Sequence, residues 1–193
     1  MAPTGTPGQR TRGRPVEIDP SRLSRTAVEL FAERGYDEVS AAEIATAAGI
    51  SRRSLFRYFP TKSDLVWDGF QESLEVLSVA LLEHGDHPPA TAVVEAVTVT
   101  AERTPVVELT RTRLQILAAH PELVALGFGR LDEQIQLCAA YLRNRGVEDL
   151  TAQVQAAAIT AAAFTGYLHW ATATSDPTPA EAVRRSLEAV SWL

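Results

Sequence analysis

The chain has 193 residues, of which 46% are hydrophobic and 22% charged, with a formal net charge of −6. This composition suits a globular protein with one ordinary domain, or a small domain joined to a medium one. The single cysteine, Cys138, excludes an internal disulfide and fits a reducing compartment. Because residues 1–8 also lack the apolar stretch of a signal peptide, we expect a cytoplasmic protein.

The charge is unevenly distributed along the chain. Residues 1–62 contain ten Lys and Arg and seven Asp and Glu, a net +3, whereas residues 63–193 contain eight and seventeen, a net −9. A basic N-terminal part on an acidic remainder predicts that only the N-terminal part meets a polyanion. The alternative is a chance asymmetry.

Residues 1–17 are expected to form a flexible basic tail, because they are rich in Gly, Pro, Thr and Arg. Arg10, Arg12 and Arg14 could enter a DNA minor groove, as homeodomain arms do, or remain solvated.

A helix is predicted directly after the tail. Asp19-Pro20 is typical of an N-cap followed by proline at the first helical position, and Gly35 is typical of a C-terminal cap. Between them, four apolar residues recur at helical spacing: Leu23, Ala27, Leu30 and Phe31.

Two short helices follow with a tight turn between them. Ser40 and Glu43 have the spacing of a capping box, Gly49 ends the helix that they open, and Ser51 caps the next one. Helix, glycine-containing turn and helix in this order are typical of a helix-turn-helix motif. Residues 18–62 are therefore predicted to form a DNA-binding domain.

The rest of the chain is also predicted to be helical. Thr61 and Asp64 resemble another capping box, opening a long helix through about Glu83; further helices are expected at 90–102, 105–119, 121–144, 150–174 and 178–191. No segment alternates as a strand would, so we predict an all-α fold. Residues 63–193 form the second predicted domain, to which the cavity and the dimer interface expected from the arguments on its helices are assigned.

The third helix carries the cations expected of a recognition helix. Arg53 and Arg57 are four residues apart and share a face with Arg52 beside them, whereas Leu55 and Phe59 point inward. The DNA major groove admits one α-helix, and arginine can bond both O6 and N7 of guanine. The alternative is an arginine-rich solvated face.

From Leu23 to Leu65 the chain resembles the TetR family of repressors. The resemblance rests on Phe31-Ala32-Glu33-Arg34-Gly35-Tyr36, on Ile44-Ala45 with Ala47-Ala48-Gly49-Ile50-Ser51, and on Phe56, Tyr58, Phe59, Lys62 and Leu65. It implies a homodimeric regulator that binds a palindromic operator in double-stranded DNA and is released by a small molecule. Transcriptional activators use the same kind of DNA-binding domain, so activation is the alternative to repression.

The resemblance assigns DNA-contacting roles to seven positions. It implies phosphate contacts for Ser40 and Lys62, base reading by Arg52, Arg53 and Ser54, and a backbone contact by Tyr58. Phe56 stands where the family usually has tyrosine, which implies a lost phosphate bond and an apolar contact, such as one with a thymine methyl.

The dimer interface is predicted in the last two helices. Residues 151–175 contain no charged side chain, and a helix apolar on all sides must be covered on all sides. The expected interface residues are Ala158, Ala162, Gly166, Val183, Leu187 and Val190. The alternative is that both helices only complete the core of the monomer. A transmembrane interpretation is disfavoured because alanines dominate the segment, so no membrane partner is expected.

A ligand cavity is expected between the long helix that starts near Lys62 and the helices of the body. The large residues available to line it are Trp67, Phe70, Leu74, Leu114, Leu117, Phe128, Phe164, Tyr167 and Trp170, each of which could equally be core. Arg111 and Arg113 could meet an anionic group or coat a surface, and His169 could fix a polar one. The segment from Phe56 to Phe70 is similar to mycofactocin-type regulators, some of which respond to long-chain acyl-CoA, which suggests a small apolar or amphipathic effector.

Enzyme function is disfavoured. His84 and His87 lack a third ligand at metal spacing, Cys138 lies among apolar residues without a nearby histidine, and no phosphate-binding glycine loop is present. We therefore expect no catalytic residue, metal or cofactor. The remaining alternative is a helical interaction or architectural protein that senses no small molecule, which a solid core and an exposed apolar patch would support.

Overall fold

The computed structural model describes residues 18–174 and 177–190, and its described part is built from α-helices without strands. The helices are α1 (Pro20–Arg34), α2 (Ala41–Ala47), α3 (Arg52–Tyr58), α4 (Lys62–Trp67), α5 (Phe70–Glu83), α6 (Pro89–Glu102), α7 (Val107–Ala119), α8 (Pro121–Leu126), α9 (Phe128–Asn144), α10 (Asp149–Thr172) and α11 (Pro179–Glu188). The all-α prediction is confirmed. The predicted tail with Arg10, Arg12 and Arg14 lies outside the described residues.

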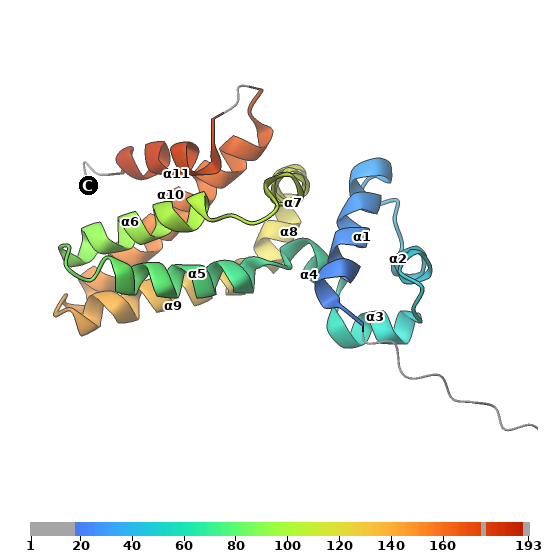
Figure 1. The fold of residues 1–193 in the computed structure, drawn as a ribbon, viewed down its shortest axis with the longest axis horizontal. Coiled ribbons are helices and arrows are strands. Elements are labelled where there is room, and N and C mark those ends of the chain that lie inside the picture. The colour runs from blue at the N-terminus through green and yellow to red at the C-terminus, as the bar shows by residue number, and fades with distance from the viewer. Residues whose placement is uncertain (1–17, 175–176, 191–193) are drawn as a thin grey trace, which may run out of the picture.

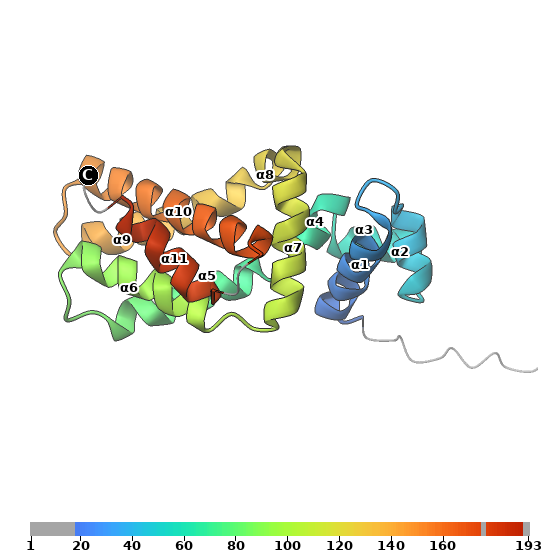
Figure 2. The ribbon, with the colours of Figure 1, turned by 90° about the horizontal axis from the view of Figure 1, so that it is seen from above.

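Helices α1, α2 and α3 form a small head at one end of an elongated molecule, and α5, α6, α9, α10 and α11 form a bundle at the other (Figure 1). Helix α4 joins the two parts. Helix α7 runs across the end of the bundle that faces the head (Figure 2). Helix α1 of the head contacts α4 and α7, so a movement of the bundle helices can be passed to the head through these contacts.

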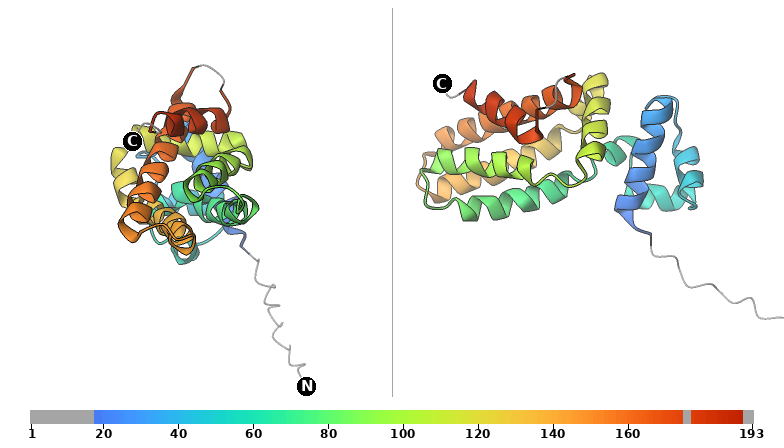
Figure 3. Two further views of the ribbon diagram at one scale, coloured as in Figure 1. Left: turned by 90° about the vertical axis from the view of Figure 1, so that its left-hand side faces the viewer. Right: turned by 45° about the horizontal axis from the view of Figure 1, so that its top comes forward.

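Two hydrophobic cores correspond to this arrangement. One core lies in the head and its junction with the body, and includes Phe31, Ile44, Leu55 and Trp170. The other fills the bundle, where α10 and α11 pack over α6 (Figure 3). The head is thus continuous with the cavity-bearing end of the body.

The predicted long helix from Thr61 to Glu83 is wrong, because the chain breaks it after Trp67. Asp68 is extended and Gly69 adopts φ +90°, a left-handed conformation that glycine tolerates without strain. Helix α5 then starts at Phe70. The apolar stripe continues across the break, which is why periodicity alone did not reveal it.

The predicted helix over 121–144 is also divided, at Gly127. A Cβ atom on Gly127 would overlap the indole of Trp67, so only glycine allows α4 to pack this closely against the start of α9. The remaining predicted boundaries agree with the structure within three residues.

Helices α10 and α11 pack on each other inside one subunit. A Cβ atom on Gly166 would lie 2.9 Å from the Cα of Val183, so glycine at this position lets the two helices approach closely. Ala162, Gly166, Val183 and Leu187 are consequently buried within the monomer. For these four residues the structure favours the alternative of monomer core over the predicted dimer contact.

No helix of the described chain is long and apolar enough to cross a membrane.

Candidate nucleic-acid interface and ligand cavity

A left-handed glycine forms the turn between α2 and α3. Gly49 has φ +69°, and the amide of Ile50 donates to the carbonyl of Ala45 at 2.9 Å, closing the end of α2. The Oγ of Ser51 accepts from the amide of Ser54 at 3.0 Å and so caps the start of α3. Local caps therefore fix the angle between the two helices.

Helix α3 turns its apolar side into the head and its cations outward. Leu55 is 1% exposed, whereas Arg52, Arg53 and Arg57 are exposed. None of these arginines forms an ion pair with any residue that the structure describes; Arg52 lies over the ring of Phe56, and Arg57 over that of Tyr58 with a 3.2 Å hydrogen bond to its hydroxyl. The charges of Arg52 and Arg57 thus lie against aromatic faces on one side, and all three arginines are open to a ligand.

The exposed hydroxyl of Ser40 takes part in the capping box of α2. It donates to Oε2 of Glu43 at 2.7 Å and accepts from the Glu43 amide. Glu43 also receives Arg34 at 2.7 Å. The bonds from the Ser40 amide and hydroxyl, together with Arg34, lower the pKa of Glu43 to about 2. A phosphate at Ser40 would share the hydroxyl with this carboxylate.

Lys62 is tied into the head more tightly than a free surface lysine. Its Nζ donates to the carbonyls of Tyr36 at 2.7 Å and Val39 at 3.2 Å, and lies 4.0 Å from the centre of the Tyr36 ring. Burial lowers its pKa, and the nearby Asp37 opposes this. Lys62 thus joins the start of α4 to the loop between α1 and α2, a structural role that sequence reasoning missed.

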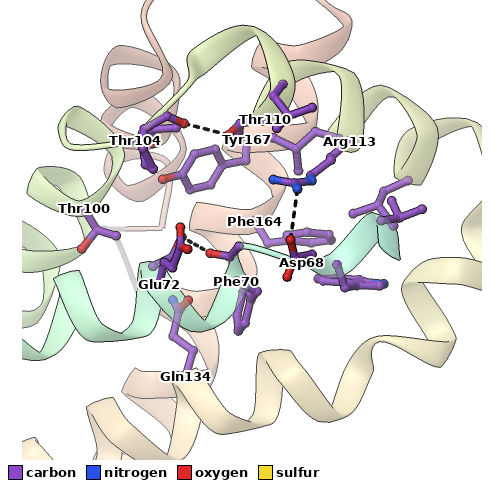
Figure 4. A pocket seen from close by; sticks show the side chains of 18 of the residues that line it. Asp68, Phe70, Glu72, Thr100, Thr104, Thr110, Arg113, Gln134, Phe164 and Tyr167 are labelled. Carbon is purple, nitrogen blue, oxygen red and sulfur yellow. Dashed lines mark hydrogen bonds and ion pairs between the residues drawn. The ribbon is translucent and has the colours of Figure 1, made fainter. Parts of the chain in front are cut away.

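A cavity of about 320 Å³ opens where the head meets the body (Figure 4). This volume lies at the lower end of the range for small-molecule sites. Its wall comes from α1, α4, α5, α6, α7, α9 and α10. Of the nine predicted lining residues, six line it: Trp67, Phe70, Leu114, Leu117, Phe164 and Tyr167. An aromatic-lined cavity argues against the alternative of a solid interaction module.

The other three predicted lining residues lie elsewhere. Leu74 is buried in α5 and does not line this cavity, and Phe128 is 63% exposed at the start of α9. Trp170 is fully buried with Arg111 over its ring at 4.7 Å. His169 is exposed and does not line the cavity. Helical spacing identified these large side chains as apolar positions, but it did not show which face of each helix borders the cavity.

Polar side chains lie around the whole cavity wall, and Arg113 is one that also bonds the head. Its Nη2 donates to the Oγ of Ser24 at 2.6 Å and lies 3.4 Å from Oδ2 of Asp68. Burial lowers the pKa of Arg113, while the charges of Asp68 and Glu72 raise it. The sequence suggested Arg113 as an anion contact, but nothing in it indicated the partners Ser24 and Asp68, which are distant along the chain.

Helix α4 is anchored to the body on its other side as well. The indole nitrogen of Trp67 donates to the carbonyl of Leu123 at 3.1 Å, and Arg130 bonds Asp64 at 2.7 Å. Burial raises the pKa of Asp64, but the hydrogen bonds from Arg130 and Thr61 outweigh this effect and lower the pKa. The helix that carries the cavity wall toward the head is therefore held from two directions.

The features considered for catalysis and metal binding do not form a site. The rings of His84 and His87 lie 5.6 Å apart, but the described residues contain no group of three ligands that could hold a metal ion. Cys138 is fully buried, and burial raises its pKa to about 12. A thiol in that environment is a poor nucleophile.

Comparison with known proteins identifies both halves of the chain. The profile of the bacterial regulatory proteins of the tetR family matches residues 23–67, and that of the MftR C-terminal domain matches residues 87–191. The mycofactocin biosynthesis transcriptional regulator MftR of Mycobacterium tuberculosis is 30% identical over 172 residues, which cover 85% of each chain.

Solved structures give the same result. FadR of Thermus thermophilus, a TetR-family transcriptional repressor crystallised with lauroyl-CoA, is 27% identical, with a TM-score of 0.61 over 88% of this chain and 92% of its own. NalD of Pseudomonas aeruginosa, the secondary repressor of a multidrug efflux pump, is 19% identical with a TM-score of 0.59 over 88% and 93%, and supports the fold alone.

The chain belongs to the TetR family of bacterial regulatory proteins, and it is a DNA-binding transcriptional regulator. Within that family its body is of the MftR type. The resemblance identified from residues 23–65 is thereby confirmed.

Proposed function

We propose that the protein is a homodimeric repressor that binds a palindromic operator and leaves it when a small amphipathic effector fills the cavity. The observation that carries the proposal is the outer face of α3, where Arg52, Arg53 and Arg57 are exposed and have no acidic partner among the residues that the structure describes. Three neighbouring cations repel one another, and phosphates or guanine edges relieve this repulsion.

Residues along α3 would divide the work of recognition. Arg53 and Arg57 share one face, which suits contact with base edges, and Arg52 and Ser54 lie at the end that enters the groove first. Phe56 and Tyr58 are half-buried beside the arginines, where Phe56 could contact a thymine methyl and Tyr58 the backbone. Ser40 and Lys62 would reach phosphates at the edges.

The outward face of α10 is the surface that we propose for the dimer. Leu150 and Val154 are 69% and 58% exposed, and the stripe continues at helical spacing through Ala158, Ala161, Thr165 and Leu168. This stripe contains no charge and small residues dominate its centre, so two copies can approach closely about a two-fold axis. Val190, half-buried in the segment after α11, remains available at its edge.

The effector is proposed to be an amphipathic molecule such as an acyl-CoA. The cavity wall is largely apolar, with Trp67, Phe70, Phe164 and Tyr167 around it, and its charged lining residues are Arg25, Asp68, Glu72 and Arg113. The lauroyl-CoA in the Thermus FadR structure supports this chemistry, because that protein shares 27% identity with this chain. A ligand releases DNA only if it prefers a conformation in which the two heads are wrongly spaced.

Footprinting of the purified protein on the DNA upstream of its own gene tests the proposal. We expect one protected palindrome, a dimer by sedimentation, and loss of protection with lauroyl-CoA. A monomer indifferent to duplex DNA at low salt would contradict the proposal. Protection that persists with lauroyl-CoA would leave DNA binding standing and reject this effector.

A further inference from the structure

One buried side chain connects the cavity to the DNA-binding head. Arg113 lies on α7, its side chain is 14% exposed, and it lines the cavity. Its Nη2 bonds Ser24 of α1 at 2.6 Å and lies 3.4 Å from Asp68, the residue that ends α4. A single guanidinium therefore contacts the head, the linking helix and the cavity.

Ser24 extends this contact to α4. It is fully buried, and its hydroxyl donates to the carbonyl of Leu65 at 3.1 Å while accepting from Arg113. Both bonds depend on the position of α1 relative to α4 and α7. Breaking these hydrogen bonds would leave buried polar groups without partners, which raises the free energy, so the bonds oppose a shift of α1.

The restraint lies where the chain can bend. Gly69 separates α4 from α5 with φ +90°, and a Cβ atom there would lie 3.1 Å from Nη1 of Arg113. The break lets α4 turn without bending a continuous helix, and the absence of a side chain makes room for the guanidinium. Hinges of this kind absorb motion at a few residues.

Arg113 also has bonding capacity left for an occupant of the cavity. Its Nε is buried and has no hydrogen-bond partner in the described part of the chain. Nε itself is shielded, so an occupant reaches this guanidinium through the part of the side chain that is exposed, and an oxygen acceptor suits that group better than an occupant that carries only donors. Such an acceptor competes with Asp68 and Ser24 for the same guanidinium.

We infer that Arg113 is the residue that transmits cavity occupancy to the head: an oxygen acceptor of the effector takes over its bonds, which frees α1 and α4 from α7. The inference rests on the proposed function, because it assumes that an effector controls DNA binding. Ser24 and Asp68 are positioning residues in this arrangement, and together with Arg113 they form what we call the α1–α7 clamp.

Operator affinity without effector tests the α1–α7 clamp directly. R113Q and S24A should each weaken operator binding about tenfold, the equivalent of one charge-assisted hydrogen bond. The fold loss of operator affinity in the double variant should be smaller than the product of the two single losses, because both substitutions remove the same Arg113–Ser24 hydrogen bond. T112A is the matched control: Thr112 is also on α7 but does not line the cavity, and its hydroxyl bonds the Glu108 carbonyl within the same helix.

Thermal unfolding of each variant checks that the head is intact. S24A is the smaller change, and it keeps the test valid if R113Q fails to fold. Wild-type operator affinity in S24A, or additive losses in the double variant, would overturn the inference whatever the effector is.

A second measurement uses lauroyl-CoA as the probe, with its binding to each variant followed by calorimetry. At saturation, wild type and T112A should lose operator affinity about tenfold or more, within the usual range of coupling, whereas occupied R113Q should change less than about threefold. Equal release of R113Q and wild type would overturn the inference. If wild type binds its operator but ignores lauroyl-CoA, only the proposed effector fails, and the measurement without effector decides on the clamp.

Discussion

The arginines of the recognition helix and those of the body have the same chemistry and opposite surroundings. Arg52, Arg53 and Arg57 are exposed and face no acid among the described residues, whereas Arg113 and Arg130 each lie against an aspartate in a partly buried site. Arg113 and Arg130 are thus paired inside the molecule, whereas the arginines of α3 are open to another molecule. Exposure and missing partners, more than the number of arginines, therefore distinguish the surface that we propose for DNA binding.

Removing one cation from the recognition helix should give the largest effect on binding. We expect Arg53→Ala to weaken operator binding by about 1–3 kcal/mol and to relax specificity at one base pair, with unchanged thermal stability. Fluorescence anisotropy on operator and single-base variants measures both quantities.

Arg143→Ala is the matched control, because Arg143 is an arginine of α9 that pairs with Asp149 far from the head. Equal losses in the two variants would mean that general charge, and not base contact, governs affinity.

Lys62 is intermediate between the exposed cations of α3 and the internally bonded cations of the body, because carbonyl groups hold it and it still lies close to the proposed DNA surface. Lys62→Ala should lower the free energy of unfolding by about 1 kcal/mol, because the carbonyls of Tyr36 and Val39 lose their donor. If its remaining proton meets a phosphate, the slope of log affinity against log salt should also fall by about 0.9.

Denaturant unfolding and salt titration separate these two effects. We expect both of them; a loss of stability with an unchanged salt slope would assign Lys62 to the interior of the head alone.

The smallest effect is expected at the acid that the head does neutralise. The pKa of Glu43 is lowered in the folded state to about 2 from an ordinary 4.5, so the folded state binds its proton more weakly. Its contribution to stability is therefore complete above about pH 4.5 and is lost as the pH falls toward 2.

Glu43→Gln should flatten the decline of stability between these two pH values, measured by thermal unfolding. The same steep decline in the variant would show that other carboxylates control acid unfolding.

The sequence predicted what local signals encode. Asp19, Ser40, Ser51 and Thr61 cap the helices as their spacing indicated, and the turn at Gly49 gives the helix-turn-helix. These features arise from bonds between residues two to four apart, which a sequence displays directly. The outward arginines followed from the same periodicity.

The features that the sequence did not reveal depend on contacts between distant segments. The breaks at Gly69 and Gly127 make room for Arg113 and Trp67, which come from other helices. The burial of Gly166 against α11 and the exposure of Phe128 likewise follow from how whole helices are oriented. Periodicity identifies an apolar face but does not say which neighbour covers it.

The division of charge along the chain gains a spatial meaning in the fold. Among the residues that the structure describes, those up to Lys62 contain seven Lys and Arg against six Asp and Glu, a net +1, and those after it contain eight against sixteen, a net −8; the two groups lie toward opposite ends of an elongated molecule (Figure 1). A polyanion exerts a torque on such a charged rod, turning it until the positive end leads. Collisions with DNA are thus biased toward the productive orientation before any base is touched.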